Sequence, residues 1–205
     1  MKNIKIAYQG MTGSNSDNAS QEMSKKIDFN KICNNDVGSI DFIEGVTSQG
    51  VVDLLINNQA DFGVVAIKNV LAGDVVETID AFNTPNFNYE VLLEEKFPIH
   101  HCVFVKDKSC EGKINKIASH IHALLQCRDY ISKFENVEEV ELSDTAIGAK
   151  HLAEGLIQED TAILCRRNAG EMFGLTLIAE NIEDIKGNYT TFVFIKKIVN
   201  PIKLK

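Results

Sequence analysis

Residues 177–195 read LIAENIEDIKGNYTTFVFI and end in an apolar run that begins near Phe192. Three small polar residues, Asn188, Thr190 and Thr191, come just before this run. A polar cluster that leads into a buried strand is a common way to place hydrogen-bonding groups at the floor of a cleft. The stretch therefore predicts a strand with a functional site at its start.

Strands and helices alternate along the rest of the chain. The run DFGVVAI at residues 61–67 is nearly all apolar, which is typical of a strand covered on both faces of a parallel sheet. The alternation predicts an α/β fold with mixed, largely parallel sheets flanked by helices. The expected strands are 4–9, 41–44, 61–67, 88–97, 99–105, 115–117, 137–142, 161–165, 176–179 and 191–198. The expected helices are 14–26, one after Thr47 or Ser48, one within 69–80, 122–134, 143–156 and 168–173.

The pattern of elements divides the chain near Ala81–Asn86 and again near Ile185–Asn188. We expect two lobes, residues 1–82 with 187–205 and residues 83–186, in a periplasmic-binding-protein-like arrangement. Two lobes joined by two crossings would hold a ligand cleft between them. Periodicity alone does not show that the last strand returns to the first lobe.

The composition is that of an ordinary globular protein, with 205 residues of which 44% are hydrophobic and 24% charged. No apolar run approaches the ~18 residues that would span a bilayer. The N-terminal stretch MKNIKIAYQG lacks the apolar core of a signal peptide. We therefore expect a cytoplasmic protein with no membrane partner.

The chain is acidic, with a formal net charge of −8 and a pI near 5.1. It has no basic stripe that could follow phosphates, so a nucleic-acid partner is excluded. If the ligand is an anion, local cations or directed backbone N–H groups must overcome the overall field.

Five scattered cysteines, an odd number without a CxxC motif, indicate reduced thiols that pack in the core. The sequence His100-His101-Cys102 has metal-binding residue types. Neighbouring side chains in a strand point to opposite faces, however, so the three cannot converge on one ion. We expect no metal site.

Serine or threonine stands just before several expected helices. For any one of them the simplest interpretation is an N-cap. Together they favour a second interpretation, because helix N-termini at the carboxyl ends of parallel strands present free N–H groups to anions. The residues concerned are Thr12 and Ser14, Thr47 and Ser48, Ser119, and Ser143 and Thr145.

Five blocks in order closely resemble the catalytic domain of the prephenate dehydratase family. The closing block GLTLIAENIEDIKGNYTTF is similar to a family motif that ends in Asn-x-Thr-Arg-Phe. The others are IAYQGMTGSNSDNAS, ADFGVVAIKNVLAGDVVETID, SHIHALLQCR and SDTAIGAKHLAEG, and the five blocks are spread between residues 6 and 192. Five ordered blocks are more specific than any single motif.

The resemblance implies an enzyme that converts prephenate to phenylpyruvate in phenylalanine biosynthesis, without a cofactor. It also implies that the last strand returns to the first lobe. Thr190 would hydrogen-bond the departing hydroxyl, in a role of orientation and relay, because threonine is a poor acid. The expected catalytic residues are Thr190, Asn69, Ser119 and His122. The expected contacts to the dicarboxylate substrate are Thr12, Ser14, Ser48, Lys68, Thr145, Asn188 and Thr191.

Three positions depart from the family pattern. Lys68 stands where the family usually has Glu, Val70 where it has Ser, and Thr191 where it has Arg. An Arg binds carboxylates through two parallel hydrogen bonds, so its absence removes one anion contact. Either Lys68 supplies the missing charge, or Lys68 is merely solvated and the site is impaired or serves another purpose.

Two other functions remain open from the residues. One is a prephenate decarboxylase of secondary metabolism, and the other is a non-catalytic paralogue that binds a small anion. The sequence does not distinguish prephenate from arogenate. Many family members continue into a regulatory ACT domain, and since Lys205 follows the closing motif so closely we expect none here. Small-residue helix faces favour a homodimer.

Overall fold

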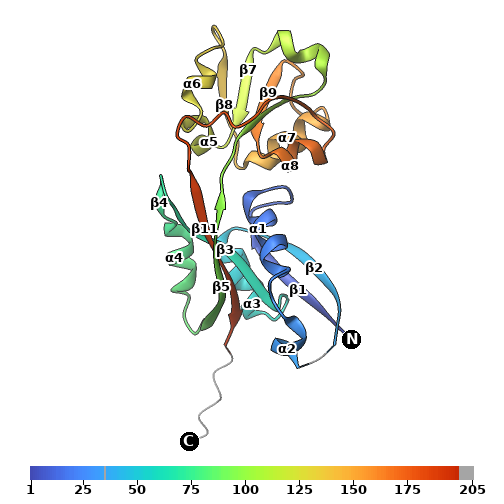
Figure 1. Cartoon of the computed structure of the whole chain (residues 1–205), viewed down its shortest axis with the longest axis vertical. Coiled ribbons are helices and arrows are strands. Elements are labelled where there is room, and N and C mark those ends of the chain that lie inside the picture. The colour runs from blue at the N-terminus through green and yellow to red at the C-terminus, as the bar shows by residue number, and fades with distance from the viewer. Residues whose placement is uncertain (35, 199–205) are drawn as a thin grey trace, which may run out of the picture. The chain divides into compact units, whose positions relative to one another are not determined.

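The computed structural model describes residues 1–34 and 36–198 and divides into two compact units (Figure 1). Unit 1 contains Met1–Met11, Ser16–Phe97 and the chain from Tyr189 onward. Unit 2 contains Thr12–Asn15 and Pro98–Asn188. Each unit has one sheet with a core on each of its faces. Residues 199–205 of the first expected lobe lie outside the described residues.

The sheet of unit 1 has the strand order β2-β1-β3-β11-β5, and the short β4 pairs with β3. β1 is parallel to both of its neighbours, whereas β11 is antiparallel to β3. The last strand therefore does return to the first unit, as the family resemblance implied. The bounds are β1 Lys2–Gln9, β2 Val37–Val46, β3 Phe62–Asn69, β4 Gly73–Asp74, β5 Tyr89–Pro98 and β11 Tyr189–Lys197.

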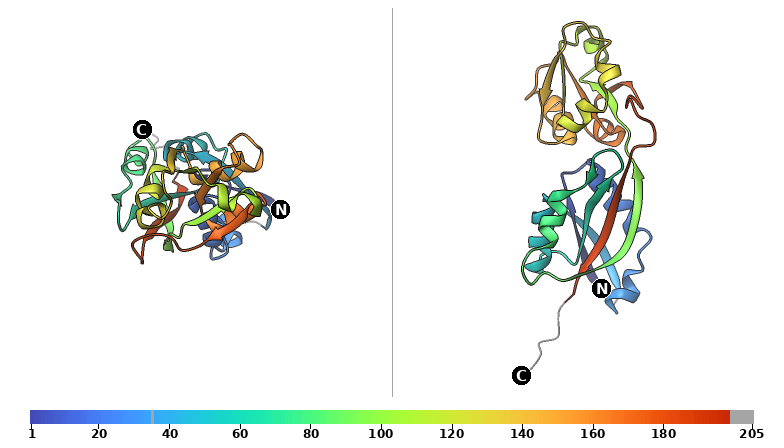
Figure 2. Two further views of the ribbon diagram at one scale, coloured as in Figure 1. Left: turned by 90° about the horizontal axis from the view of Figure 1, so that it is seen from above. Right: turned by 90° about the vertical axis from the view of Figure 1, so that its left-hand side faces the viewer.

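Helices cover both faces of this sheet, as the apolar run at 61–67 predicts (Figure 2). Adjacent residues of β3 enter different cores, so Val64 packs with Phe29 and Met23 while Val65 packs with Leu55. The first core includes residues of α1 (Asn15–Ser24) and α2 (Phe29–Cys33), and the second includes residues of α3 (Ser48–Ile56) and α4 (Val76–Phe82). Burial on both faces explains why these strands lack polar alternation.

The sheet of unit 2 has the order β10-β6-β9-β7-β8. β7 is parallel to β8 and β9, while β6 is antiparallel to β9 and β10. One of its two cores includes residues of α7 and α8, and the other includes residues of α5 and α6. The bounds are β6 Cys102–Val105, η1 Lys108–Lys113, β7 Lys116–Ser119, α5 Ile121–Leu125, α6 Arg128–Ile131, β8 Glu138–Glu141, α7 Thr145–Ala153, β9 Thr161–Cys165, α8 Arg167–Met172 and β10 Thr176–Ala179. Two mixed sheets with helices on both faces confirm the α/β class.

The structure corrects the boundary expected at residue 82. The chain passes from unit 1 to unit 2 after Phe97, because β5 pairs with β11 in the first sheet. The proline and asparagines near residue 85 mark only the turn that leads into β5. In the described residues, no helix is long and apolar enough to cross a membrane.

The helix expected over 122–134 is two short helices, α5 and α6. The carboxylate of Asp184 explains the break, because it accepts hydrogen bonds from the N–H groups of Arg128 (2.8 Å) and Asp129 (3.0 Å) at the start of α6. These N–H groups would otherwise continue a helix from α5. A cap that comes from so far along the chain leaves no local signal in the sequence.

Val46 ends β2 in a strained backbone conformation. Its φ is 62°, which β-branched residues rarely adopt, and across it the N–H of Thr47 donates to the carbonyl oxygen of Gly45 at 2.7 Å. The side chain is 59% exposed, so its removal opens no cavity. We expect Val46→Gly to raise the free energy of unfolding by about 1 kcal/mol, because glycine tolerates positive φ.

Urea unfolding measures this change. Val91→Gly is the matched control, since Val91 lies in β5, is 49% exposed and is not among the residues with positive φ. This control is expected to lose stability, because glycine weakens a strand. Equal losses in the two variants would contradict strain at Val46.

Candidate functional site

Asn69 and Thr190 form a hydrogen-bonded pair at the ends of two central strands of the unit 1 sheet. They stand opposite one another where β3 ends and β11 begins. The Nδ2 of Asn69 donates to Oγ1 of Thr190 at 2.9 Å and to the carbonyl oxygen of Tyr189 at 3.2 Å. The Oδ1 of Asn69 accepts from the N–H groups of Leu71 and Ala72 at 3.0 and 2.9 Å. Hydrogen bonds at both Nδ2 and Oδ1 therefore hold the amide of Asn69 in one orientation.

This orientation determines what the Thr190 hydroxyl can do. Because Oγ1 accepts the hydrogen bond from Asn69, the hydroxyl hydrogen remains to be donated elsewhere. Thr190 is only 9% exposed, so few water molecules compete for that hydrogen. The pair thus presents a directed O–H donor, which suits an oxygen atom that gains negative charge.

Lys68 and Thr191 form the next opposed pair of the same two strands. Adjacent residues of a strand point to opposite faces, so the side chain of Lys68 leaves β3 on the other face from Asn69. The side chain of Lys68 is 63% exposed and its Nζ lies 3.7 Å from Oδ1 of Asp74. Thr191 is buried. Val70, the third departure from the family pattern, is exposed and its N–H donates to the carbonyl oxygen of Tyr189.

Ser48 is fully buried at the start of α3 and its polar groups are used within unit 1. Its hydroxyl lies 2.8 Å from Oγ1 of Thr78, which itself donates to the carbonyl oxygen of Ala66 at 2.6 Å. The N–H of Ser48 donates to the carboxylate of Glu77 at 2.8 Å. Thr47 is the side-chain cap of this helix, so the start of α3 is satisfied by side chains of the protein itself.

Ser119 is the last residue of β7 and is also fully buried. Its hydroxyl donates to the carbonyl oxygen of Leu164 in β9 at 2.6 Å. The helix that follows is capped by His120, whose Nδ1 accepts from the N–H of His122. The ring of His122 is exposed and its centroid lies 5.2 Å from that of His120. Burial, followed by the neighbouring His122, lowers the pKa of His120.

Unit 2 brings Thr12, Ser14 and Thr145 to one region. The loop Thr12–Asn15 belongs to this unit, and a Cβ added to Gly13, whose φ is 88°, would lie 3.2 Å from Ala169 and 3.6 Å from Ala146. Ser14 is buried, Thr12 exposed and Thr145 half-buried. The loop is also held by Nη1 of Arg166, which donates to Oδ1 of Asn15 at 3.0 Å.

The cap of α7 differs from the prediction. Asp144, not Ser143, accepts the hydrogen bond from the N–H of Ala146, at 2.6 Å. Asp, like Ser, is a preferred N-cap residue, so the sequence allowed both. Thr145 is therefore the first residue of the helix rather than part of its cap.

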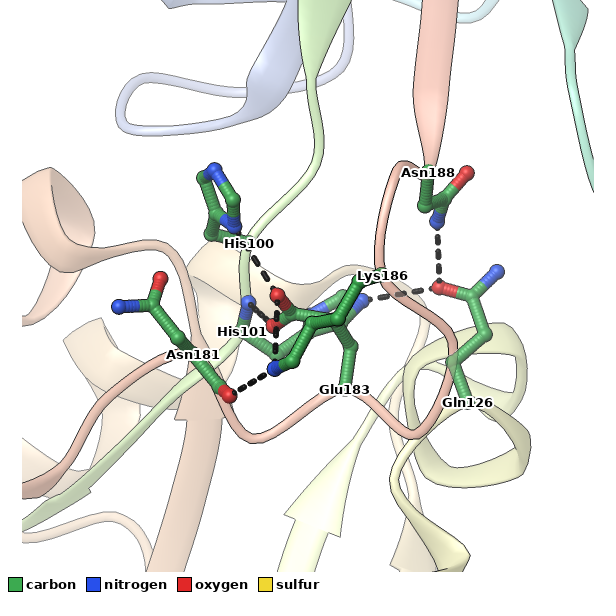
Figure 3. Close-up of polar contacts among 7 residues, drawn as sticks. All are labelled: His100, His101, Gln126, Asn181, Glu183, Lys186 and Asn188. Atoms are coloured by element: carbon green, nitrogen blue, oxygen red, sulfur yellow. Dashed lines mark hydrogen bonds and ion pairs between the residues drawn. The ribbon is translucent and has the colours of Figure 1, made fainter.

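Asn188 is nearly buried and belongs to a polar cluster of unit 2 (Figure 3). Its Nδ2 donates to Oε1 of Gln126 at 3.1 Å, and the same oxygen lies 3.0 Å from Nε2 of His101. Neither Gln126 nor His101 was among the residues expected in the site. Gln126 stands in the block SHIHALLQCR, which could have indicated it, whereas His101 was considered only as a metal ligand.

The carboxylate of Glu183 holds the other side of this cluster, and its side chain is only 3% exposed. It accepts from the backbone N–H of His101 at 3.1 Å, lies 3.0 Å from Nδ1 of His100 and lies 3.5 Å from Nζ of Lys186. Burial acts to raise the pKa of Glu183, but the hydrogen bonds from His100 and the backbone outweigh it and hold the pKa below its usual value.

Within the described residues, no group of three or more His, Cys, Asp and Glu is arranged to hold a metal ion. The five cysteines are free thiols, and four of them are buried. Burial raises the pKa of Cys127 to about 12. A buried thiol with so high a pKa is a packing residue and a poor nucleophile.

A family model described as prephenate dehydratase matches residues 6–199. The bifunctional chorismate mutase/prephenate dehydratase of Stutzerimonas stutzeri is 28% identical over 195 residues, which are 94% of this chain and 48% of that protein. This chain spans about half the length of the curated relatives it matches.

Two solved structures share the fold. The quorum-quenching acylase GqqA has a TM-score of 0.77 at 21% identity, and the prephenate dehydratase of Arthrobacter aurescens in complex with L-Phe has 0.76 at 22% identity. Both matches cover 96% of this chain, and they cover 65% and 60% of those chains. Because the two proteins are named for different activities, this likeness describes the fold alone.

Proposed function

Since this chain belongs to the prephenate dehydratase family, we propose that it converts prephenate to phenylpyruvate, carbon dioxide and water. The C–O bond to the ring hydroxyl breaks, the C–C bond to the ring carboxylate breaks, and the electrons of the latter complete the aromatic ring. The departing hydroxide takes a proton and leaves as water. Aromatisation supplies the driving force, so the protein must chiefly position the substrate and stabilise the departing oxygen.

The hydrogen bond from Asn69 to Thr190 is the observation that carries this proposal. It leaves the hydroxyl hydrogen of Thr190 for the oxygen that departs from the ring. Threonine is a weak acid, so the proposed role is to orient that oxygen and relay a proton from water. Asn69 is the proposed orienting residue.

The proposed substrate contacts are those that the family resemblance implies, which are Thr12, Ser14, Thr145, Asn188 and Thr191. Ser48 and Ser119 are fully buried and their hydroxyls contact other parts of the protein, which favours structural roles for both. His122 is exposed and stays a proposed contact.

Lys68 is the proposed replacement for the missing arginine. Its place opposite Thr191 supports this, because opposed residues of antiparallel strands have Cβ atoms about 5 Å apart. We expect Lys68→Glu to raise the KM for prephenate about tenfold, with a smaller change in kcat, because a charge-assisted contact is replaced by repulsion. Steady-state kinetics with prephenate measure both constants.

Lys25→Glu is the matched control for this variant. Its side chain is 66% exposed just after the end of α1, and the substitution changes the net charge of the protein by the same amount. It is expected to leave both constants unchanged. Unchanged or improved turnover in Lys68→Glu would remove Lys68 from the site.

A cytoplasmic homodimer is also proposed. The small residues of α7 do not support it, because Ala146, Gly148 and Ala149 are buried within unit 2. Support comes instead from exposed apolar side chains of unit 1, which are Val70, Leu71, Val76 and Ile79. Sedimentation of the purified protein distinguishes a dimer from a monomer.

The test of the activity is to follow phenylpyruvate formation and total substrate loss with purified protein, using prephenate and arogenate in parallel. Phenylpyruvate from prephenate supports the proposal. Loss of prephenate without phenylpyruvate would indicate decarboxylation alone, and turnover of arogenate alone would change the substrate. No loss of either would contradict an enzyme of this family.

A further inference from the structure

We propose that His101 is a positioning residue, which orients Gln126 and, through it, Asn188 for the proposed reaction. The inference rests on the proposed function, in which Asn188 contacts the substrate. It concerns a continuous chain of hydrogen bonds within unit 2, from the imidazole of His101 to Oε1 of Gln126 and on to Nδ2 of Asn188 (Figure 3).

The chemistry of the shared acceptor determines the direction of each hydrogen bond. Oε1 of Gln126 has no hydrogen, so it accepts from Asn188 and from His101 alike. Nε2 of His101 must therefore carry its hydrogen, which identifies the tautomer. Two donors therefore hold Oε1 in place. If the amide of Gln126 turned by 180°, its NH₂ group would face the N–H donors of Asn188 and His101, which is unfavourable.

The same contacts orient Asn188. Because its Nδ2 faces Gln126, its Oδ1 points away from Gln126, as Figure 3 shows. Loss of the imidazole would leave Gln126 with one donor and allow its amide to turn.

His101 is well placed to act as a fixed donor. It is 5% exposed, its N–H donates to Glu183 and its carbonyl oxygen accepts from the N–H of Ile182 at 3.1 Å. Its Nδ1 is buried and has no hydrogen-bond partner among the described residues. A second proton would place an unpartnered N–H there, so the neutral form is favoured.

The charges around the ring agree with a neutral imidazole. Burial lowers the pKa of His101 most. The hydrogen bond with Gln126 and the carboxylate of Glu183 act to raise it, while His100 and Arg166 act to lower it, and the net direction is down. The lowered pKa therefore agrees with a neutral ring, and the hydrogen bond to Gln126 determines which nitrogen carries the hydrogen.

The kinetic test uses His101→Phe, which keeps a ring and removes the donor, together with Gln126→Ala and the double variant. We expect each single variant to lose about tenfold in kcat/KM for prephenate, because small displacements of binding groups are costly. The double variant is expected to lose no more than Gln126→Ala alone, since the imidazole acts through that amide. His151→Phe, which changes a histidine of α7 outside this cluster, is expected to keep wild-type kinetics.

Nitrogen NMR of the His101 ring provides a readout that does not depend on turnover or on a variant that folds. The expected result is a neutral ring with its hydrogen on Nε2 in the wild-type protein. A ring with its hydrogen on Nδ1, additive losses in the double variant, or unchanged kcat/KM in His101→Phe would each overturn the inference. A wild-type protein that does not turn over prephenate contradicts the proposed function instead, and the NMR result then decides alone whether His101 holds Gln126.

Discussion

Thr190→Val is expected to lower kcat/KM for prephenate by about two to three orders of magnitude, with most of the loss in kcat. Valine has the shape of threonine without the hydroxyl, so the substrate still enters while the departing oxygen loses its directed donor. Positioned proton donors contribute on the order of 10²–10⁴ in rate. Steady-state formation of phenylpyruvate measures the change.

Two further measurements make this result interpretable. Thr190→Ser keeps the hydroxyl and is expected to keep activity within about tenfold of the wild type, because serine can accept from Asn69 and donate in the same way. The valine variant should lose about 1 kcal/mol of unfolding free energy, because Asn69 loses an acceptor. A valine variant that retained full kcat would show that Thr190 has no part in the reaction.

The sequence predicted the class of fold because burial on both faces leaves a clear pattern in short apolar runs. The strands expected at 61–67 and 161–165 match the bounds of β3 and β9 closely. The boundary predicted between the units was wrong, because nothing in the sequence of β5 indicates which of the two sheets it joins. β5 belongs to the first sheet because it pairs with β11, and that pairing joins distant parts of the chain.

The candidate site was predictable as a set of residue types but not as a set of contacts. Ser48 begins α3 and Ser119 comes shortly before α5, as residues at an anion site would, yet their hydroxyls contact Thr78 and the carbonyl oxygen of Leu164. Nothing near either serine in the sequence indicates those partners. His101 was missed for the same reason, because its partner Gln126 lies on another element.

The register of β3 and β11 connects two departures from the family pattern. Lys68 and Thr191 stand opposite each other, as Asn69 and Thr190 do. In a chain with the usual family residues, the first pair would be Glu opposite Arg, with no net charge. Here the same pair is Lys opposite Thr and carries one positive charge. This change of charge is seen only when the two positions are considered together.

The second large effect is expected from Asn69→Asp, which changes one amide nitrogen to oxygen. Oδ1 can still accept from the N–H groups of Leu71 and Ala72, so the turn after β3 should persist. The new oxygen faces Oγ1 of Thr190, where Nδ2 now donates at 2.9 Å. The hydroxyl would then donate to the carboxylate, and its hydrogen would no longer reach the departing oxygen. We expect kcat/KM for prephenate to fall about a hundredfold or more at neutral pH.

The pH dependence of this variant separates the loss of a donor from a loss of structure. Protonation of the introduced carboxyl restores an O–H that can donate to Thr190, so the activity relative to wild type should rise as the pH falls through the carboxyl pKa, which is about 4 when unperturbed and higher when partly buried. Asn3→Asp adds the same charge to an exposed residue of β1 and is expected to behave as wild type at every pH. A loss in Asn69→Asp that did not change with pH would indicate a change of structure, and would contradict control of the reaction by the hydrogen bond to Thr190.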